Sequence, residues 1–199
     1  MTSHVSVASE RFALDVYPVN LAAGMADDVR RGLLSQPKAL LPKYFYDAAG
    51  SELFDAITEL PEYYQTRTEL AILRGAMPGI VERHQPGELV ELGSGSSRKT
   101  VAILDAMDEA DTLVRYVPFD VSEVALVAAA ERIARRYPNI EVHAIGGDFD
   151  RHIGQVPPSV AGTTRLVAFL GGTLGNLFPS ERRAFLRTMR SLLAPADRL

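Results

Sequence analysis

From residue 86 onward, short apolar runs rich in valine, leucine and phenylalanine alternate with segments of helical periodicity. Strands that alternate with helices form βαβ units with right-handed crossovers. This part of the chain is therefore predicted to be an α/β domain built on a mostly parallel sheet. The pattern predicts strands at 88–92, 116–119, 141–145 and 166–170, and helices at 97–107, 122–137 and 179–193.

The part of the chain before residue 86 has a different character. Residues 21–34, 51–58 and 66–83 have helical periodicity, and Pro78 is expected to break the last of these helices. No strand pattern is convincing in this region. We therefore predict a set of helices that precedes the sheet.

The expected organisation has three parts. The first twenty residues lack helical periodicity, so we predict an N-terminal arm at 1–20 rather than a regular element. A helical cap that contributes to the substrate site is expected at 21–85, and the sheet domain at 86–199. Residues 194–199 have the pattern of a turn that leads into a further strand. We therefore expect a sheet domain truncated after its fourth strand and the following helix.

Composition excludes several classes of protein. The 199 residues are 47% hydrophobic and 23% charged, which is typical of a globular domain with a buried core. There is no cysteine, which excludes disulfide frameworks, thiolate nucleophiles and zinc sites with sulfur ligands. The four histidines lack metal-ligand spacing, so no metal site is predicted. The net charge of −4 argues against nucleic-acid binding, and no apolar run could span a bilayer, so we expect a cytoplasmic protein.

Polar residues and glycines follow all four predicted strands. Ligands of open α/β sheets bind beyond the carboxyl ends of the strands, so these residues are candidates for one shared site. Asp120 alone could equally cap the next helix, but the acids and the amide recur one βα unit apart, which capping does not explain. In strand order the candidates are Gly93 and Gly95, then Asp120, then Asp148 with Phe149, then Asn176.

The turn after the first strand discriminates between nucleotide cofactors. A dinucleotide fingerprint requires a third glycine where this chain has Arg98. S-adenosylmethionine has no phosphate, and its ribose diol suits Asp120 while its adenine suits the Asp148–Phe149 pair. Lys99 is either a solvated surface lysine or a partner for the carboxylate of this cofactor. We favour S-adenosylmethionine and keep an NAD(P)-dependent oxidoreductase as the alternative.

Longer stretches of the chain match a known family. The matching motifs are PKYFYD at 42–47, GSELFD at 50–55, LPEYYQTR at 60–67, ELGSGSSRKT at 91–100, GDF at 147–149 and TLGNL at 173–177. From about residue 21 onward, the chain resembles the L-histidine Nα-methyltransferases of ergothioneine biosynthesis. The resemblance implies a Rossmann-like methyltransferase sheet that uses S-adenosylmethionine to trimethylate the α-amino group of L-histidine, giving hercynine.

The same resemblance implies roles for individual residues. Tyr46 would lie close to the reacting amine. We assign it an orienting role, because a tyrosine with an ordinary pKa near 10 is a poor general base at neutral pH. The cofactor contacts would be Gly93, Lys99, Asp120, Asp148 and Phe149, and the substrate contacts would be Tyr63 and Asn176.

Members of this family are longer than the present chain. Their C-terminal part supplies further strands and further contacts to histidine, so we expect the 199-residue chain alone to be a poor enzyme. A non-enzymatic alternative is a truncated or degenerate chain that binds a nucleoside without turnover. The resemblance implies a full-length monomer with a small amino-acid substrate and without nucleic-acid or membrane partners.

Overall fold

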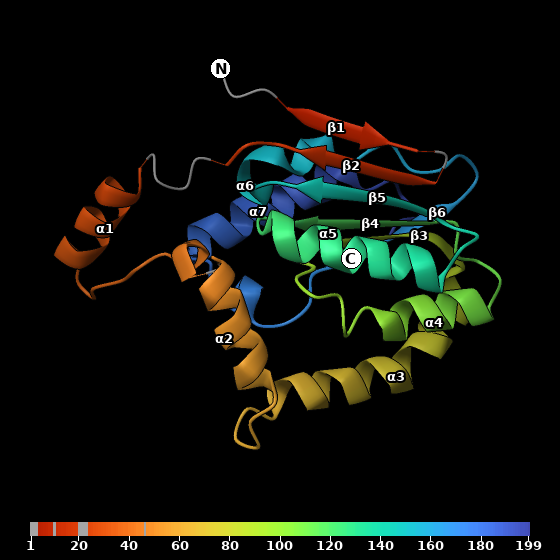
Figure 1. The fold of residues 1–199 in the computed structure, drawn as a ribbon, viewed down its shortest axis with the longest axis horizontal. Helices are drawn as coiled ribbons and strands as arrows, with labels where there is room; N and C mark the ends of the chain where they lie inside the picture. The colour runs from red at the N-terminus through yellow and green to blue at the C-terminus, as the bar shows by residue number, and fades with distance from the viewer. Residues whose placement is uncertain (1–3, 10, 20–23, 46) are drawn as a thin grey trace.

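The computed structural model describes residues 4–9, 11–19, 24–45 and 47–199, and a six-stranded sheet forms its centre (Figure 1). The strand order is β1-β2-β5-β4-β3-β6. The β1–β2 pair is antiparallel, and the other neighbouring strands are parallel. The strands are β1 (Val5–Ala8), β2 (Phe12–Val16), β3 (Pro86–Leu92), β4 (Arg115–Asp120), β5 (Glu141–Gly146) and β6 (Thr164–Ala168).

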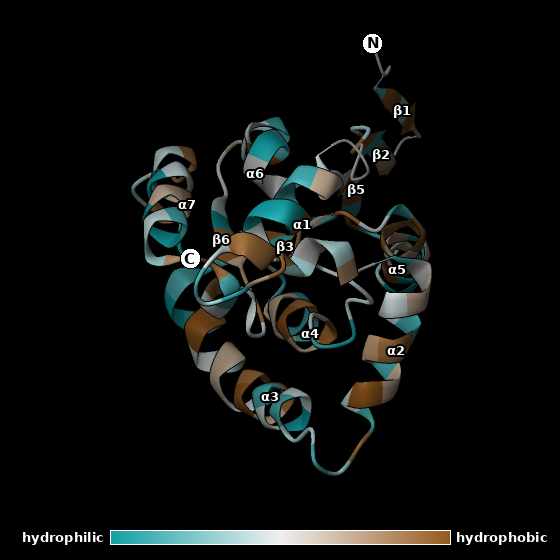
Figure 2. Ribbon diagram, turned by 90° about the vertical axis from the view of Figure 1, so that its left-hand side faces the viewer, coloured by the Kyte–Doolittle hydropathy of each residue, from teal (hydrophilic) through white to brown (hydrophobic). Residues whose placement is uncertain are grey.

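Helices cover both faces of the sheet. One face carries α4 and α5, with α3 packed on the outer side of α4, and the opposite face carries α7 (Figure 2). Helix α1 stands away from the sheet and buries no residue (Figure 1). The α-helices are α1 (Met25–Leu34), α2 (Ala48–Thr58), α3 (Gln65–His84), α4 (Val101–Glu109), α5 (Glu123–Arg136), α6 (Phe149–His152) and α7 (Pro179–Leu192), and the 3-10 helices are η1 (Pro42–Phe45), η2 (Ile153–Gln155) and η3 (Thr173–Asn176).

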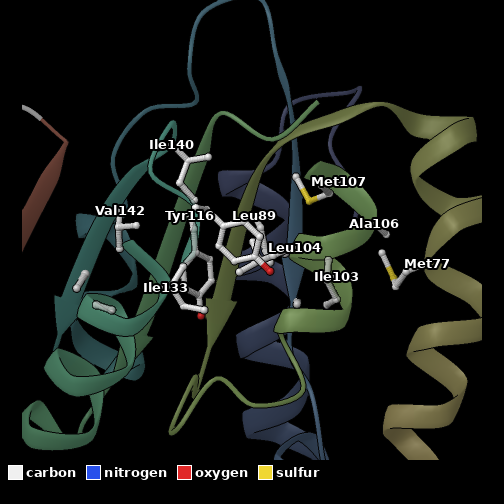
Figure 3. Close-up of a cluster of buried hydrophobic side chains, with 14 of the residues drawn as sticks. Met77, Leu89, Ile103, Leu104, Ala106, Met107, Tyr116, Ile133, Ile140 and Val142 are labelled. Atoms are coloured by element: carbon white, nitrogen blue, oxygen red, sulfur yellow. The ribbon is translucent and has the colours of Figure 1, made fainter. Parts of the chain in front are cut away.

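Successive residues of the central strands feed two separate hydrophobic clusters. Leu89 of β3 and Tyr116 of β4 pack toward α3, α4 and α5 (Figure 3). Their neighbours Val90 and Val117 pack toward α7 on the other face. Side chains alternate across a strand, so a strand covered on both faces is apolar throughout rather than at every second position. This explains the continuous apolar runs, and the predicted α/β class is confirmed.

The expectation of an arm without secondary structure is wrong for the described residues near the N-terminus. Strand β2 pairs in parallel with β5, and β1 pairs with β2, so the two extend the edge of the sheet. Val5 and Val7 of β1 are more than half exposed. Both strands are short and lie at an edge of the sheet. Pairing of β2 with β5 and of β1 with β2, rather than a strong local sequence pattern, stabilises them. The boundaries of the three predicted parts stay a prediction.

Two further expectations concern Pro78 and residues 194–199. Pro78 does not break its helix, because α3 continues through it to His84. Pro78 is exposed, so water can satisfy the carbonyl that loses its amide partner. Near the other end, Arg198 forms a parallel bridge with Leu166 of β6, which agrees with the strand pattern expected there.

Candidate functional site

The turn after β3 is fastened to the end of β4. Gly93 (φ 69°) and Gly95 (φ 47°) adopt left-handed conformations that favour glycine. The backbone amides of Gly93 and Ser94 both donate to the Phe119 carbonyl, at 2.8 and 3.1 Å. A Cβ at either glycine would meet no described atom within 4 Å. The turn is thus anchored by hydrogen bonds to the end of β4, and the space beside Gly93 and Gly95 is open to a ligand.

The Asp120 carboxylate lies at the end of β4, beside this turn. Its Oδ2 accepts a hydrogen bond from the Gly95 amide at 2.7 Å, and its Oδ1 accepts one from the Ser122 amide at 2.8 Å. Burial raises the pKa of Asp120, and the amide hydrogen bonds oppose that shift. Each carboxylate oxygen has a second lone pair, so the group can also accept from a ligand hydroxyl. Asp120 therefore supports the start of α5 and faces the turn at the same time.

Asp148 and Phe149 follow β5, the next strand of the sheet. The Gly147 amide donates to the Asp120 carbonyl at 2.8 Å, which ties the ends of β4 and β5 together. Asp148 is half-buried, and its backbone amide lies 3.2 Å from Nδ1 of His152. Phe149 begins α6, and its side chain lies outside the described part of the structure. Because β3, β4 and β5 run parallel, both residues lie at the carboxyl ends of the strands, as Gly93 does.

Lys99 pairs with a residue that the sequence did not single out. Its ammonium group forms an ion pair with Oε2 of Glu69 on α3. The other carboxylate oxygen, Oε1, accepts from the Gly171 amide at 2.6 Å, in the turn after β6. Glu69 thereby connects α3 to the segments that follow β3 and β6. On sequence alone it is an ordinary charge on a helix, and no local signal marks it.

The three residues expected near the substrate are less completely placed. Tyr63 is half-buried just before α3, and its ring meets the Phe54 ring edge-on at 6.2 Å between centroids. Asn176 ends η3, beyond β6, and is exposed. Tyr46 lies outside the described residues. The strand order places Asn176 at the carboxyl edge of the sheet, which also carries Asp120. Among the described residues, no hydrogen bond or ring contact joins Asn176 to Tyr63.

A buried polar network lies beneath the glycine turn. The Glu91 carboxylate accepts from the Thr100 hydroxyl at 2.6 and 2.7 Å and from the Tyr116 hydroxyl at 2.6 Å. Burial raises the pKa of Glu91 to about 7, although both hydroxyls lower it. Within the described part of the chain, the buried Ser94 hydroxyl has no hydrogen-bond partner. That leaves one buried polar atom in the turn free for a ligand.

Comparison with known proteins identifies the family. A family model described as "Histidine-specific methyltransferase, SAM-dependent" matches residues 25–199. The chain belongs to this family. It is 50% identical over 178 residues to the histidine N-alpha-methyltransferase of Mycolicibacterium smegmatis, covering 89% of this chain and 54% of the relative. For the enzyme of that name from Mycobacterium tuberculosis the identity is 47% over 172 residues, covering 86% and 53%.

The chain spans about half the length of these curated relatives. Among solved structures, the mitomycin 7-O-methyltransferase MmcR superposes with a TM-score of 0.54 at 17% identity, covering 88% of this chain and 47% of that one. At this identity the similarity concerns the fold, which is the Rossmann-like α/β fold. Because the histidine-specific methyltransferase family is SAM-dependent, it favours S-adenosylmethionine over the nicotinamide dinucleotide kept as an alternative.

The described residues contain no group of three or more histidine and acidic side chains arranged to hold a metal ion. Among the same residues, no helix combines the length and the apolar character needed to cross a membrane.

Proposed function

We propose that this chain carries the cofactor half of an enzyme that transfers methyl groups from S-adenosylmethionine to the α-amino group of L-histidine, as its family relatives do. The observation that carries the proposal is the Asp120 carboxylate, held by the Gly95 and Ser122 amides with lone pairs to spare. Two adjacent acceptor oxygens suit the two hydroxyls of a ribose. The rigid placement means that little ordering is needed when the ligand binds.

Other residues of the site also fit this cofactor. Gly93 lets a ligand approach the backbone closely, since a Cβ position there is open. The Ser94 hydroxyl supplies a donor or acceptor that no described residue uses. Lys99 supplies a positive charge for the carboxylate at the amino-acid end. We keep Asp148 and Phe149 as the contacts to the adenine, at the neighbouring strand end.

When bound, S-adenosylmethionine supplies a methyl group on a positively charged sulfur. The work of the protein is to hold the amine in line with that methyl group and to exclude competing water. We assign Tyr63 and Asn176 to holding the histidine, and Tyr46 to orienting its amine. The attacking amine must be neutral, and we expect its proton to leave to solvent, because an ordinary tyrosine is a poor base.

The experiment combines binding and turnover. S-adenosylhomocysteine binding is measured by calorimetry, and the chain is then incubated with S-adenosylmethionine and L-histidine while mono-, di- and trimethylated products are followed by mass spectrometry. Methyl groups on the α-nitrogen support the proposal. Methyl groups on the imidazole would contradict the assigned acceptor. Because the chain spans about half the length of its relatives, turnover is also measured on the full-length protein. Tight binding without any methylated product there would favour the alternative of a nucleoside-binding chain without turnover.

The compartment and the oligomeric state are also part of the proposed function. We propose that the enzyme works in the cytoplasm and that the full-length protein is a monomer, as the family resemblance implies. Sedimentation of the protein with and without S-adenosylhomocysteine tests the second statement. A stable dimer at low micromolar concentration would contradict it.

A further inference from the structure

The ion pair between Lys99 and Glu69 lies where three segments meet. Lys99 follows the β3 turn, Glu69 belongs to the first part of α3, and Gly171 follows β6 and donates its amide to Glu69 at 2.6 Å. The Lys99 side chain is 26% exposed and that of Glu69 is 28% exposed. The pair is thus partly desolvated, yet each side chain keeps about a quarter of its surface exposed to solvent.

Both charges keep unused hydrogen-bonding capacity. An ammonium group has three donors, and a carboxylate has about four acceptor positions. The contacts with each other and with Gly171 use one donor of Lys99 and two acceptor positions of Glu69. The adjacent pair of Arg98 and Glu59 differs, because its side chains are 62% and 75% exposed and belong to an ordinary solvated surface. Lys99 and Glu69 can therefore bind a further group without giving up each other.

The cofactor proposed above ends in an α-amino acid, whose ammonium and carboxylate groups are attached to one carbon. If Lys99 alone bound the carboxylate, the ammonium of the ligand would lie close to the lysine ammonium, and like charges repel. Glu69 provides the opposite charge at that place. We propose that Glu69 and Lys99 form a subsite for this zwitterion, in which Glu69 accepts from the ammonium and Lys99 donates to the carboxylate. The inference rests on the proposed function, and its new part is the role of Glu69.

The first experiment compares two ligands of the chain and of Glu69→Gln by calorimetry. S-adenosylhomocysteine carries the amino-acid end, whereas 5′-methylthioadenosine lacks it but keeps the adenosine. Glu69→Gln should weaken S-adenosylhomocysteine binding about 10- to 100-fold, the usual effect of losing a charge-assisted hydrogen bond. Its affinity for 5′-methylthioadenosine should stay within about twofold of the unaltered chain, which also shows that the variant folds.

Two further ligands separate the role of Glu69 from an indirect effect through Lys99. Decarboxylated S-adenosylhomocysteine keeps the ammonium, and deaminated S-adenosylhomocysteine keeps the carboxylate. Glu69→Gln should weaken the first and leave the second unchanged or slightly tighter. The reverse pattern would overturn the inference, because it would mean that Glu69 only positions Lys99. Tighter binding of S-adenosylhomocysteine itself would also overturn it, because Glu69 would then compete with the ligand carboxylate.

Glu59→Gln is the matched control. It removes a carboxylate that pairs with Arg98, next to Lys99 in sequence, and should change the affinity for none of the four ligands. If Glu69→Gln and Glu59→Gln behave alike, the subsite is wrong while the proposed function stands. If the unaltered chain binds neither S-adenosylhomocysteine nor 5′-methylthioadenosine, the proposed function fails and this inference fails with it.

Discussion

Glu88 and Glu91 lie on the same strand, β3, yet their carboxylates meet entirely different partners. Glu88, near the start of the strand, is fully buried between the guanidinium groups of Arg115 and Arg165, and the Arg115 Nε donates to it at 2.6 Å. Glu91, near the end of the strand, is 3% exposed and accepts from neutral hydroxyl groups. One end of the strand balances its buried charge with opposite charge, and the other does not.

The surroundings extend this difference. At the Glu88 end, Arg165 also donates to the Pro157 carbonyl at 2.6 Å. This arginine therefore anchors the segment before β6 and also neutralises Glu88. At the Glu91 end lie the open glycine turn, the Asp120 lone pairs and the Ser94 hydroxyl that no described residue bonds. Fully satisfied polar groups stabilise a fold, whereas groups with remaining capacity are available to a ligand. The strand thus carries a structural end and a binding end.

Glu88→Gln is the substitution with the largest expected effect. It leaves two buried guanidinium groups without their counter-charge, which should lower the free energy of unfolding by about 3 to 5 kcal/mol. Urea denaturation measures the change. Glu131→Gln is the control, because its pair with Arg135 is exposed and its removal should not shift the midpoint measurably. A Glu88→Gln midpoint equal to that of the control would show that this end is not structural.

Glu91 should make stability depend on pH. Its pKa is raised to about 7 in the folded state, so the folded protein holds the proton more tightly than the unfolded chain. That contribution is present below pH ~4.5, the unfolded pKa. It is lost as pH rises to about 7, by up to about 3 kcal/mol.

The difference between the chain and Glu91→Gln isolates this contribution. The variant cannot lose a proton at this position, so its stability should fall less between pH 5 and 7 in urea titrations at successive pH values. Glu62→Gln, an exposed position, should follow the unaltered chain throughout. Parallel curves for Glu91→Gln and the unaltered chain would mean that the buried carboxyl does not titrate in this range.

Asp120→Ala tests the binding end directly. Loss of a charge-assisted acceptor should cost about 1.5 to 3 kcal/mol of S-adenosylhomocysteine binding, measured by calorimetry. Asp108→Ala, at an exposed position near the end of α4, should bind as tightly as the unaltered chain. An unchanged affinity in Asp120→Ala would remove this residue from the site and leave its hydrogen bonds to Gly95 and Ser122 as its whole function.

Asn176→Ala should have the smallest effect and should act on the other ligand. Loss of a neutral hydrogen bond should weaken histidine binding about fivefold to tenfold, measured with S-adenosylhomocysteine already present. The affinity for S-adenosylhomocysteine itself should not change. Asn139→Ala, in the exposed turn before β5, serves as the control. Equal losses for histidine and S-adenosylhomocysteine would place Asn176 in the cofactor half of the site.

The central strands could be predicted from the sequence because they are buried on both faces. Val90 and Val117 belong to one core and Leu89 and Tyr116 to the other, so successive residues in the middle of these strands are apolar. The edge strand β1 could not be predicted in this way. Its residues, Val5 to Ala8, are all exposed, and the strand is recognised by its pairing with β2.

The candidate site shows the same limit. Asp120 and Gly93 could be predicted because chain topology alone brings strand ends together. Glu69 could not, since its position depends on how α3 packs against α4, and the sequence around Glu69 does not show which residues that packing brings near it. The same holds for Pro78, whose effect depends on its being on the solvent side of α3.

The pairing of β2 with β5 also sets an order of events for the nascent chain. Residues 12–16 emerge from the ribosome long before residues 142–146, the strand against which they must align. Closing so long a segment carries an entropic cost, and such contacts form late in folding. We therefore expect the central strands and their helices to form first and the β1–β2 hairpin to dock last. By the same reasoning its amides should exchange with deuterated solvent sooner than those of β3 or β4.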